Sequence, residues 1–143
     1  MKGHLCKAVI AAALILGTAL PAASAERWTA TSTTAIAITG DIEIAGDTLI
    51  FGNGARLPLT PLGDRQGRWS PVGKVTSGKV YKLTPPSDPT LLNSNQLCGM
   101  PEPVTYIVLA QSSPRSLSLT AFTGANPPQG FGDNSCAAYF YER

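Results

Sequence analysis

The stretch from Asp47 to Leu59, DTLIFGNGARLPL, predicts a β-hairpin and with it the fold class. If residues 52–54 form a three-residue loop with Gly54 in the left-handed region, the apolar side chains fall on one face: Leu49, Phe51, Ala55, Leu57 and Leu59. A two-residue loop at Asn53-Gly54 would instead place Leu57 opposite Ile50 and split the apolar set between two faces. Because burial of one face fixes strand register, we predict the three-residue loop.

Other segments carry the same alternation. From Ala35 to Ile44 the isoleucines fall at even positions, which predicts a strand with a kink at Gly40. A second hairpin is predicted from Val72–Val75 and Val80–Leu83, joined by a turn at residues 76–79. Val104–Ala110 is almost continuously apolar, so we predict a strand that is covered on both faces and lies at the centre of the sheet. Two further strands are expected at residues 117–121 and 136–141.

The composition agrees with short strands and many turns. The chain has 143 residues, enough for one domain, with 14 glycines and 12 prolines. No segment shows helical periodicity, and the prolines recur too often for long helices. We therefore predict an all-β fold, a small antiparallel barrel or sandwich of about seven to nine short strands with one disulfide.

The N-terminal segment has the features of an export signal. Lys2 and Lys7 precede the apolar run Ala8–Leu20, and Ala23-Ser24-Ala25 fits a cleavage site. We expect residues 1–25 to be a signal peptide, residues 26–143 a single β-rich domain, and the location periplasmic or extracellular. In such a compartment paired cysteines are oxidised, so we predict a disulfide between the two that remain after cleavage, Cys98 and Cys136.

Cleavage after Ala25 would also remove His4, the only histidine. Without histidine, neither a Ser-His-Asp nor a Cys-His nucleophile can form, and zinc cannot bind through imidazole. We therefore expect no enzymatic activity, no cofactor and no metal. The remaining chain has nine basic and nine acidic residues, which argues against nucleic-acid binding. We assign Asp41, Glu43 and Asp47 to a solvated strand face in preference to acid/base chemistry.

Positive charge is concentrated in the middle of the chain. Between residues 56 and 82 a single acidic residue, Asp64, accompanies six basic ones: Arg56, Arg65, Arg68, Lys74, Lys79 and Lys82. Such a sector fits an acidic partner, whether an acidic glycan, a lipid headgroup or an envelope protein. The alternative is that these side chains lie on different strands and faces and serve solubility. We expect Arg65 and Arg68 to flank a turn at Gln66-Gly67.

Two tryptophans and one loop phenylalanine are the remaining candidates for contact with a ligand. Trp28 and Trp69 are expected to fill the core or its rim. Residues 124–135 are rich in Pro, Gly and Asn and predict a loop. Phe131 in this loop is either a plug packed against the barrel or an exposed contact anchor, and we predict the plug because burial of a Phe stabilises by about 1.5–3 kcal/mol.

Two short resemblances bear on function. Leu97-Cys98-Gly99, Val104–Leu109 and Cys136–Tyr141 resemble small exported proteins of Gram-negative bacteria with no assigned function, over the last third of the chain. Separately, Ser77-Gly78-Lys79-Val80-Tyr81 is similar to a segment of periplasmic inhibitors of c-type lysozyme, which are small disulfide-bridged β-barrels. We expect a non-catalytic binding module of the periplasm or medium, with an envelope inhibitor of a hydrolase such as c-type lysozyme as the alternative.

Overall fold

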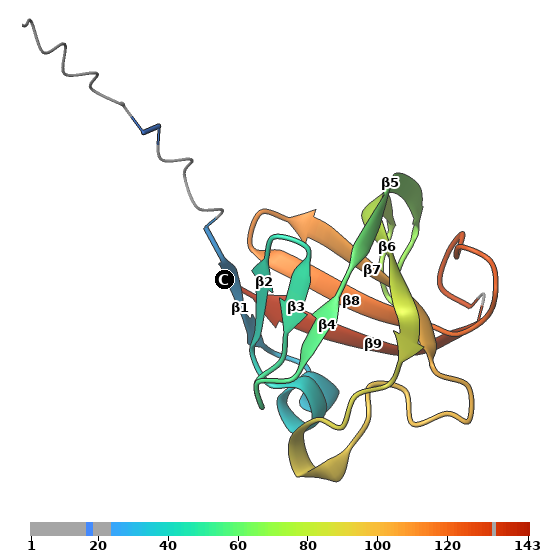
Figure 1. Cartoon of the computed structure of the whole chain (residues 1–143). Helices are drawn as coiled ribbons and strands as arrows, with labels where there is room; N and C mark the ends of the chain where they lie inside the picture. The colour runs from blue at the N-terminus through green and yellow to red at the C-terminus, as the bar shows by residue number, and fades with distance from the viewer. Residues whose placement is uncertain (1–16, 19–23, 133) are drawn as a thin grey trace, which may run out of the picture.

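The computed structural model describes residues 17–18, 24–132 and 134–143, which form one curled antiparallel sheet (Figure 1). The sheet is open, and its strand order is β4-β3-β2-β1-β9-β8-β7-β6-β5. The strands are β1 (Glu26–Ala30), β2 (Ile42–Ala45), β3 (Thr48–Ile50), β4 (Arg56–Pro58), β5 (Thr60–Arg68), β6 (Val75–Ser87), β7 (Val104–Ser113), β8 (Ser116–Phe122) and β9 (Ser135–Glu142). The predicted all-β class, strand number and disulfide are confirmed.

The connection between β4 and β5 explains why the sheet curls. These strands are the two edges of the sheet, yet only Leu59 separates them in the chain. The edges must therefore come together, and the concave face encloses the main core. That core fills the interior with large apolar side chains, among them Trp28, Leu49, Phe51, Leu83, Ile107, Leu119, Tyr139 and Tyr141.

The hairpin that predicted the fold class forms as expected. Leu49 pairs with Leu57, and the amide of Phe51 donates to the carbonyl of Ala55 at 2.9 Å, so the loop has three residues. Gly54 has φ 85°, the left-handed conformation that glycine adopts without steric cost. The longer loop and its register are confirmed.

The predicted strand Ala35–Ile44 is only half correct. Ala35–Thr39 forms a helical turn, η1, and only Ile42–Ala45 is a strand. Ser32 holds the start of the turn, because its hydroxyl accepts the amide of Ala35 at 3.2 Å and its carbonyl accepts that of Ile36 at 2.9 Å. Local bonds of this kind compete with a strand ladder, and period two alone does not reveal them.

The turns predicted at Gln66-Gly67 and at residues 76–79 are also wrong. Both segments lie inside strands, where Gln66 pairs with Ser77 and Gly67 with Thr76. The chain reverses between Arg68 and Val75 instead. Glycine inside a strand marks a close approach of another group, and here that group is a tryptophan described below.

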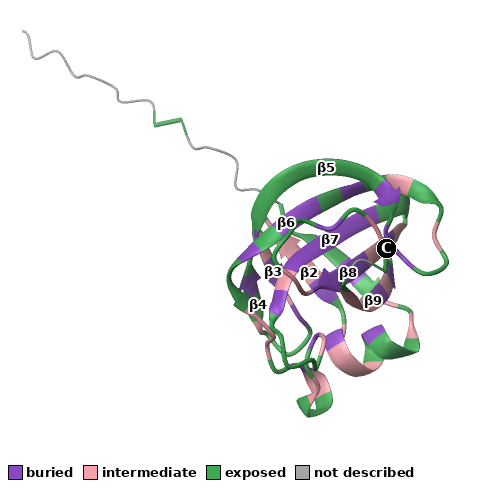
Figure 2. Ribbon diagram, turned by 90° about the vertical axis from the view of Figure 1, so that its right-hand side faces the viewer, coloured by how far each residue is buried: buried purple, intermediate pink, exposed green. Residues whose placement is uncertain are grey.

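Strand β7 is covered on both faces, as predicted. Ile107 and Leu109 face the main core, whereas Tyr106, Val108 and Ala110 belong to a second core on the convex face. Figure 2 shows this burial, with β5 exposed along the rim of the molecule. The predicted central position is wrong, because β9 is the middle strand of the sheet and β7 is the third from the β5 edge.

One end of the curled sheet is closed by three loops, and we call it the closed end. Here η1, the 52–54 loop and the second helical turn, η2 (Leu92–Ser94), meet. A Cβ atom on Gly40 would lie 2.9 Å from Leu92 Cδ1, which shows how tightly η1 and η2 pack. The side-chain amide of Asn53 donates to the carbonyl of Thr90 at 3.0 Å and fixes the hairpin loop to this end.

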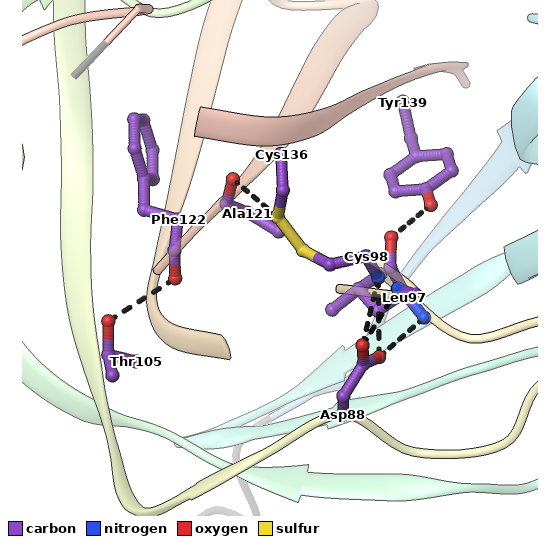
Figure 3. The surroundings of a disulfide bond; sticks show 9 residues. Asp88, Leu97, Cys98, Thr105, Ala121, Phe122, Cys136 and Tyr139 are labelled. Carbon is purple, nitrogen blue, oxygen red and sulfur yellow. Dashed lines mark hydrogen bonds between the residues drawn. A yellow bond between two sulfur atoms is a disulfide. The ribbon is translucent and has the colours of Figure 1, made fainter. Parts of the chain in front are cut away.

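The disulfide joins the loop before β7 to the start of β9 (Figure 3). Cys98 and Cys136 have their Cα atoms 5.4 Å apart. Asp88 organises the loop, since its carboxylate accepts the backbone amides of Leu97 at 2.7 Å, Cys98 at 3.2 Å and Gly99 at 2.9 Å. Charge-assisted bonds of this type are stronger than neutral ones, so Asp88 stabilises the loop in addition to the covalent link.

Two buried tyrosines make stability sensitive to alkaline pH. Burial, followed by the charge of Asp88, raises the pKa of Tyr139 to about 12, and burial raises the pKa of Tyr141 further, although its hydrogen bond with Thr39 opposes the shift. An unfolded tyrosine ionises near pH 10, so above that pH the unfolded chain binds fewer protons than the folded one.

We predict that the free energy of unfolding is unaffected by these groups below pH 9 and falls above pH 10, by up to about 1.4 kcal/mol per pH unit for each tyrosine. Urea titrations between pH 8 and about pH 12 measure the slope. Tyr139→Phe should be less stable at neutral pH, because it loses the bond to the Leu97 carbonyl, but should show a shallower alkaline decline. An unchanged slope in this variant would contradict the assignment.

The described residues include no helix long and apolar enough to cross a membrane. The predicted apolar run of the signal peptide lies outside the described residues, except for Gly17 and Thr18.

Candidate binding surface

The turn between β5 and β6 is anchored to the convex face by Trp69. Its indole ring is buried and lies over two glycines of neighbouring strands, Gly67 and Gly78. A Cβ atom on Gly78 would come within 2.5 Å of the indole nitrogen, and one on Gly67 within 2.8 Å of the ring. The indole N–H donates to the carbonyls of Arg65 and Thr76, each at 3.2 Å. The absence of side chains at Gly67 and Gly78 therefore leaves the space in which the Trp69 ring packs.

Further contacts fix Trp69 from the other side. Phe122 packs edge-on against its ring, with centroids 6.3 Å apart, and the Thr120 hydroxyl donates to its carbonyl. The prediction that both tryptophans are core residues is confirmed, because Trp28 and Trp69 are each 1% exposed. The turn that follows Trp69 is thus built on a rigid base.

Beyond this base the turn carries exposed apolar side chains. Val72 is 83% exposed and Val75 is 68% exposed. Exposed valines this close together forfeit the stabilisation that burial would give them. We call residues 68–75, together with Phe131, the hairpin tip.

The loop from Thr123 to Asn134 brings Phe131 to the hairpin tip. The Arg65 guanidinium donates to the carbonyl of Pro128 at 3.2 Å, and the amide of Phe131 donates to the carbonyl of Arg68 at 2.6 Å. Pro128 is buried, whereas Phe131 is 39% exposed. The expected loop is confirmed, but Phe131 is not a buried plug, because more than a third of its side chain is exposed.

Cations accompany the apolar side chains of the hairpin tip. Arg68 and Lys74 are both exposed. Within the described part of the chain the ion pairs are Arg27–Glu43 at 3.5 Å and Arg143–Glu26 at 3.8 Å, and neither involves the tip. The two positive charges of the tip are therefore open to a partner.

A groove of about 560 Å³ separates the hairpin tip from the convex face of β7–β9. Val72, Lys74 and Val75 line it from the tip, and Ser112, Ser118 and Phe140 line it from the sheet. Trp69 thus holds the base of the tip against the convex face, and the apolar groups beyond it also line this groove.

The six basic residues proposed from sequence do not form one patch. Arg65, Arg68 and Lys74 lie at or next to the hairpin tip, and Arg65 is occupied by its bond to the 123–134 loop. Lys79 shares the concave face with Tyr81 and Leu109, whereas Lys82 lies on the opposite face and Arg56 on β4. Basic residues that are close in the sequence need not share one surface, because alternate residues of a strand point to opposite faces.

The valines of the tip were missed as contact residues. The alternation predicts a strand over Val72–Val75, which would bury alternate side chains. The sequence Ser70-Pro71-Val72-Gly73 contains turn-forming residues, and a turn assigned there would have exposed Val72.

Two of the three acidic residues assigned to a solvated face, Asp41 and Glu43, have side-chain partners. Asp41 accepts the amide of Ala30 at 2.9 Å, and Glu43 pairs with Arg27. Across residues 17–18, 24–132 and 134–143, no group of three or more His, Cys, Asp and Glu is placed to hold a metal ion.

The segment that resembles lysozyme inhibitors, residues 77–81, lies within β6. Gly78 supports Trp69, Val80 joins the convex core and Tyr81 joins the main core. Three of its five residues are thus used in packing.

No known protein family, no curated protein and no solved structure matches the chain.

Proposed function

We propose that the protein is a non-catalytic binding module of the cell envelope that attaches to an anionic lipid surface through the hairpin tip. The observation that carries the proposal is the pair of exposed valines, Val72 and Val75, next to the cations Arg68 and Lys74, which form no ion pair with any residue that the structure describes. A lipid interface offers both an apolar layer and phosphate groups, so it matches both kinds of side chain at once.

The lipid surface fits the tip better than a soluble acidic glycan does. A glycan would engage the cations but leave Val72 and Val75 in water, whereas shallow insertion buries them. Trp69, packed on Gly67 and Gly78, holds the turn in place, so the turn loses little conformational entropy when it docks. Two cations contribute about 1 kcal/mol each near such a surface, so the binding should be weak, reversible and reduced by salt.

We predict that Arg68→Glu combined with Lys74→Glu lowers the partition coefficient on phosphatidylcholine–phosphatidylglycerol vesicles at least about 30-fold, because two favourable charges are lost and repulsion is added. Co-sedimentation at low and physiological salt measures the effect. Val72→Ser with Val75→Ser should also weaken binding, even at high salt where the electrostatic part is screened.

The matched control is Arg56→Glu with Lys82→Glu, which changes the net charge equally but lies away from the tip. Retained binding in this control, together with loss in the tip variant, supports the proposal. Equal loss in both would indicate a response to net charge alone and contradict it. Inhibition of c-type lysozyme by protein that does not bind vesicles would instead support the inhibitor alternative.

A further inference from the structure

The end of the curled sheet opposite the closed end opens into a second hollow, of about 430 Å³, which we call the open mouth. It is lined by residues of β1, β2, β5, β6 and β7, and it shares only Thr76 with the groove at the hairpin tip. Ser24, which the expected cleavage after Ala25 would remove, also lines it. The open mouth is therefore a distinct candidate site.

Part of this lining is apolar. Leu109 and Tyr81 belong to the main core, and Ile44 packs against that core. A ligand in the open mouth would thus contact the edge of the apolar interior, as is usual for small-molecule sites. Burial, followed by the charges of Asp47, Asp64 and Glu26, raises the pKa of Tyr81, so its phenol stays protonated at neutral pH and can donate a hydrogen bond.

The polar part of the lining contains opposite charges that do not neutralise each other. Lys79 and Asp64 are cross-strand partners on β6 and β5, and both line the open mouth. No ion pair within 4.0 Å joins them in the described part of the chain, where Glu26 pairs instead with Arg143 at 3.8 Å. The Lys79 ammonium and the Asp64 carboxylate are therefore both available to a ligand.

We propose that the open mouth binds a small zwitterion with an apolar portion, of the size of an apolar amino acid or a dipeptide. The carboxylate of the ligand would face Lys79, its ammonium would face Asp64, and its apolar portion would lie against Leu109 and Ile44. The volume lies in the range of small-ligand sites and is too small for a folded partner. A ligand with a single charge would leave one of the two protein charges desolvated and unpaired.

The probe is leucyl-leucine, tested on the purified protein by calorimetry and by amide chemical shifts. We expect saturable millimolar binding, with shifts at Ser77, Lys79 and Gln111. Lys79→Gln should weaken leucyl-leucine about fivefold but leave binding of leucyl-leucine amide unchanged, because the amide lacks the carboxylate. Asp64→Asn should likewise weaken leucyl-leucine but leave binding of N-acetyl-leucyl-leucine unchanged, because the acetylated ligand lacks the ammonium.

Lys82→Gln is the matched control, since it removes the same charge from the other face of β6. No saturable binding at millimolar concentration would overturn the inference. So would equal losses for leucyl-leucine and its amide in Lys79→Gln. Vesicle binding through the hairpin tip does not depend on this pocket, so either proposal can fail alone.

Discussion

Loss of the Cys98–Cys136 disulfide is expected to lower the free energy of unfolding by about 4 kcal/mol. The two cysteines are 38 residues apart in the chain, and cross-linking a loop of this size restricts the unfolded ensemble by that amount in the chain-entropy model. For a domain of this size the change corresponds to a fall in Tm of more than about 10 °C. Thermal unfolding of the C98S/C136S variant, compared with the oxidised protein, measures it.

Reducing agent should have no further effect on this double variant, which serves as the control for the treatment. In the chain from Glu26 onward, thiol titration under denaturing, non-reducing conditions should find no reactive group. About two thiols per chain would contradict the bond. The carboxylate of Asp88 still holds the loop through the amides of residues 97–99, so the reduced protein should retain its strands at low temperature.

Trp69→Ala is expected to lower the free energy of unfolding by about 3–5 kcal/mol, as is typical for a buried aromatic residue. The indole is 1% exposed, covers Gly67 and Gly78, and bonds to two carbonyls of the β5–β6 hairpin. Removing it leaves a cavity on the convex face and frees the hairpin tip. Urea unfolding measures the loss, and Val72→Ala, an exposed neighbour, should change stability by less than about 0.5 kcal/mol.

Gly78→Ala tests the same contact from the strand side. The added methyl group would meet the indole nitrogen at 2.5 Å and Val108 Cγ1 at 2.6 Å, and we expect overpacking of this kind to cost about 1–3 kcal/mol. In a Trp69→Ala background the part of this cost that comes from the indole should disappear, whereas the contact with Val108 remains. Fully additive effects in the double variant would show that the two residues do not interact.

The sequence alone predicts those parts of the fold that depend on a single local pattern. The Asp47–Leu59 hairpin and the strands at residues 117–121 and 136–141 are present as predicted, because alternation and turn chemistry act over short range. The disulfide is present as predicted, because only two cysteines follow residue 25. Val104–Ala110 was identified as covered on both faces for the same reason. Its place in the sheet depends on the whole topology, and the central position predicted for it was wrong.

The errors have a different cause, since each depends on a contact that alternation along one segment does not reveal. Gly67 and Gly78 suggested turns, but their role is to accommodate Trp69. Ala35–Thr39 has the alternation of a strand, but Ser32 begins a helical turn and Tyr141, more than one hundred residues later, bonds Thr39. The hairpin tip was partly anticipated through Arg68, Lys74 and Phe131. Its exposed valines follow from the true position of the turn.

The central claim, that the hairpin tip is the surface that contacts a lipid layer, is tested most directly by paramagnetic broadening of backbone amide signals. The protein is mixed with bicelles that contain phosphatidylglycerol and a lipid spin-labelled at its headgroup. We predict that broadening is greatest at Arg68, at residues 72–75 and at Phe131, and small at Arg56 and Lys82. Broadening centred on β4 or on the closed end, or none above that of a freely diffusing label, would contradict the account.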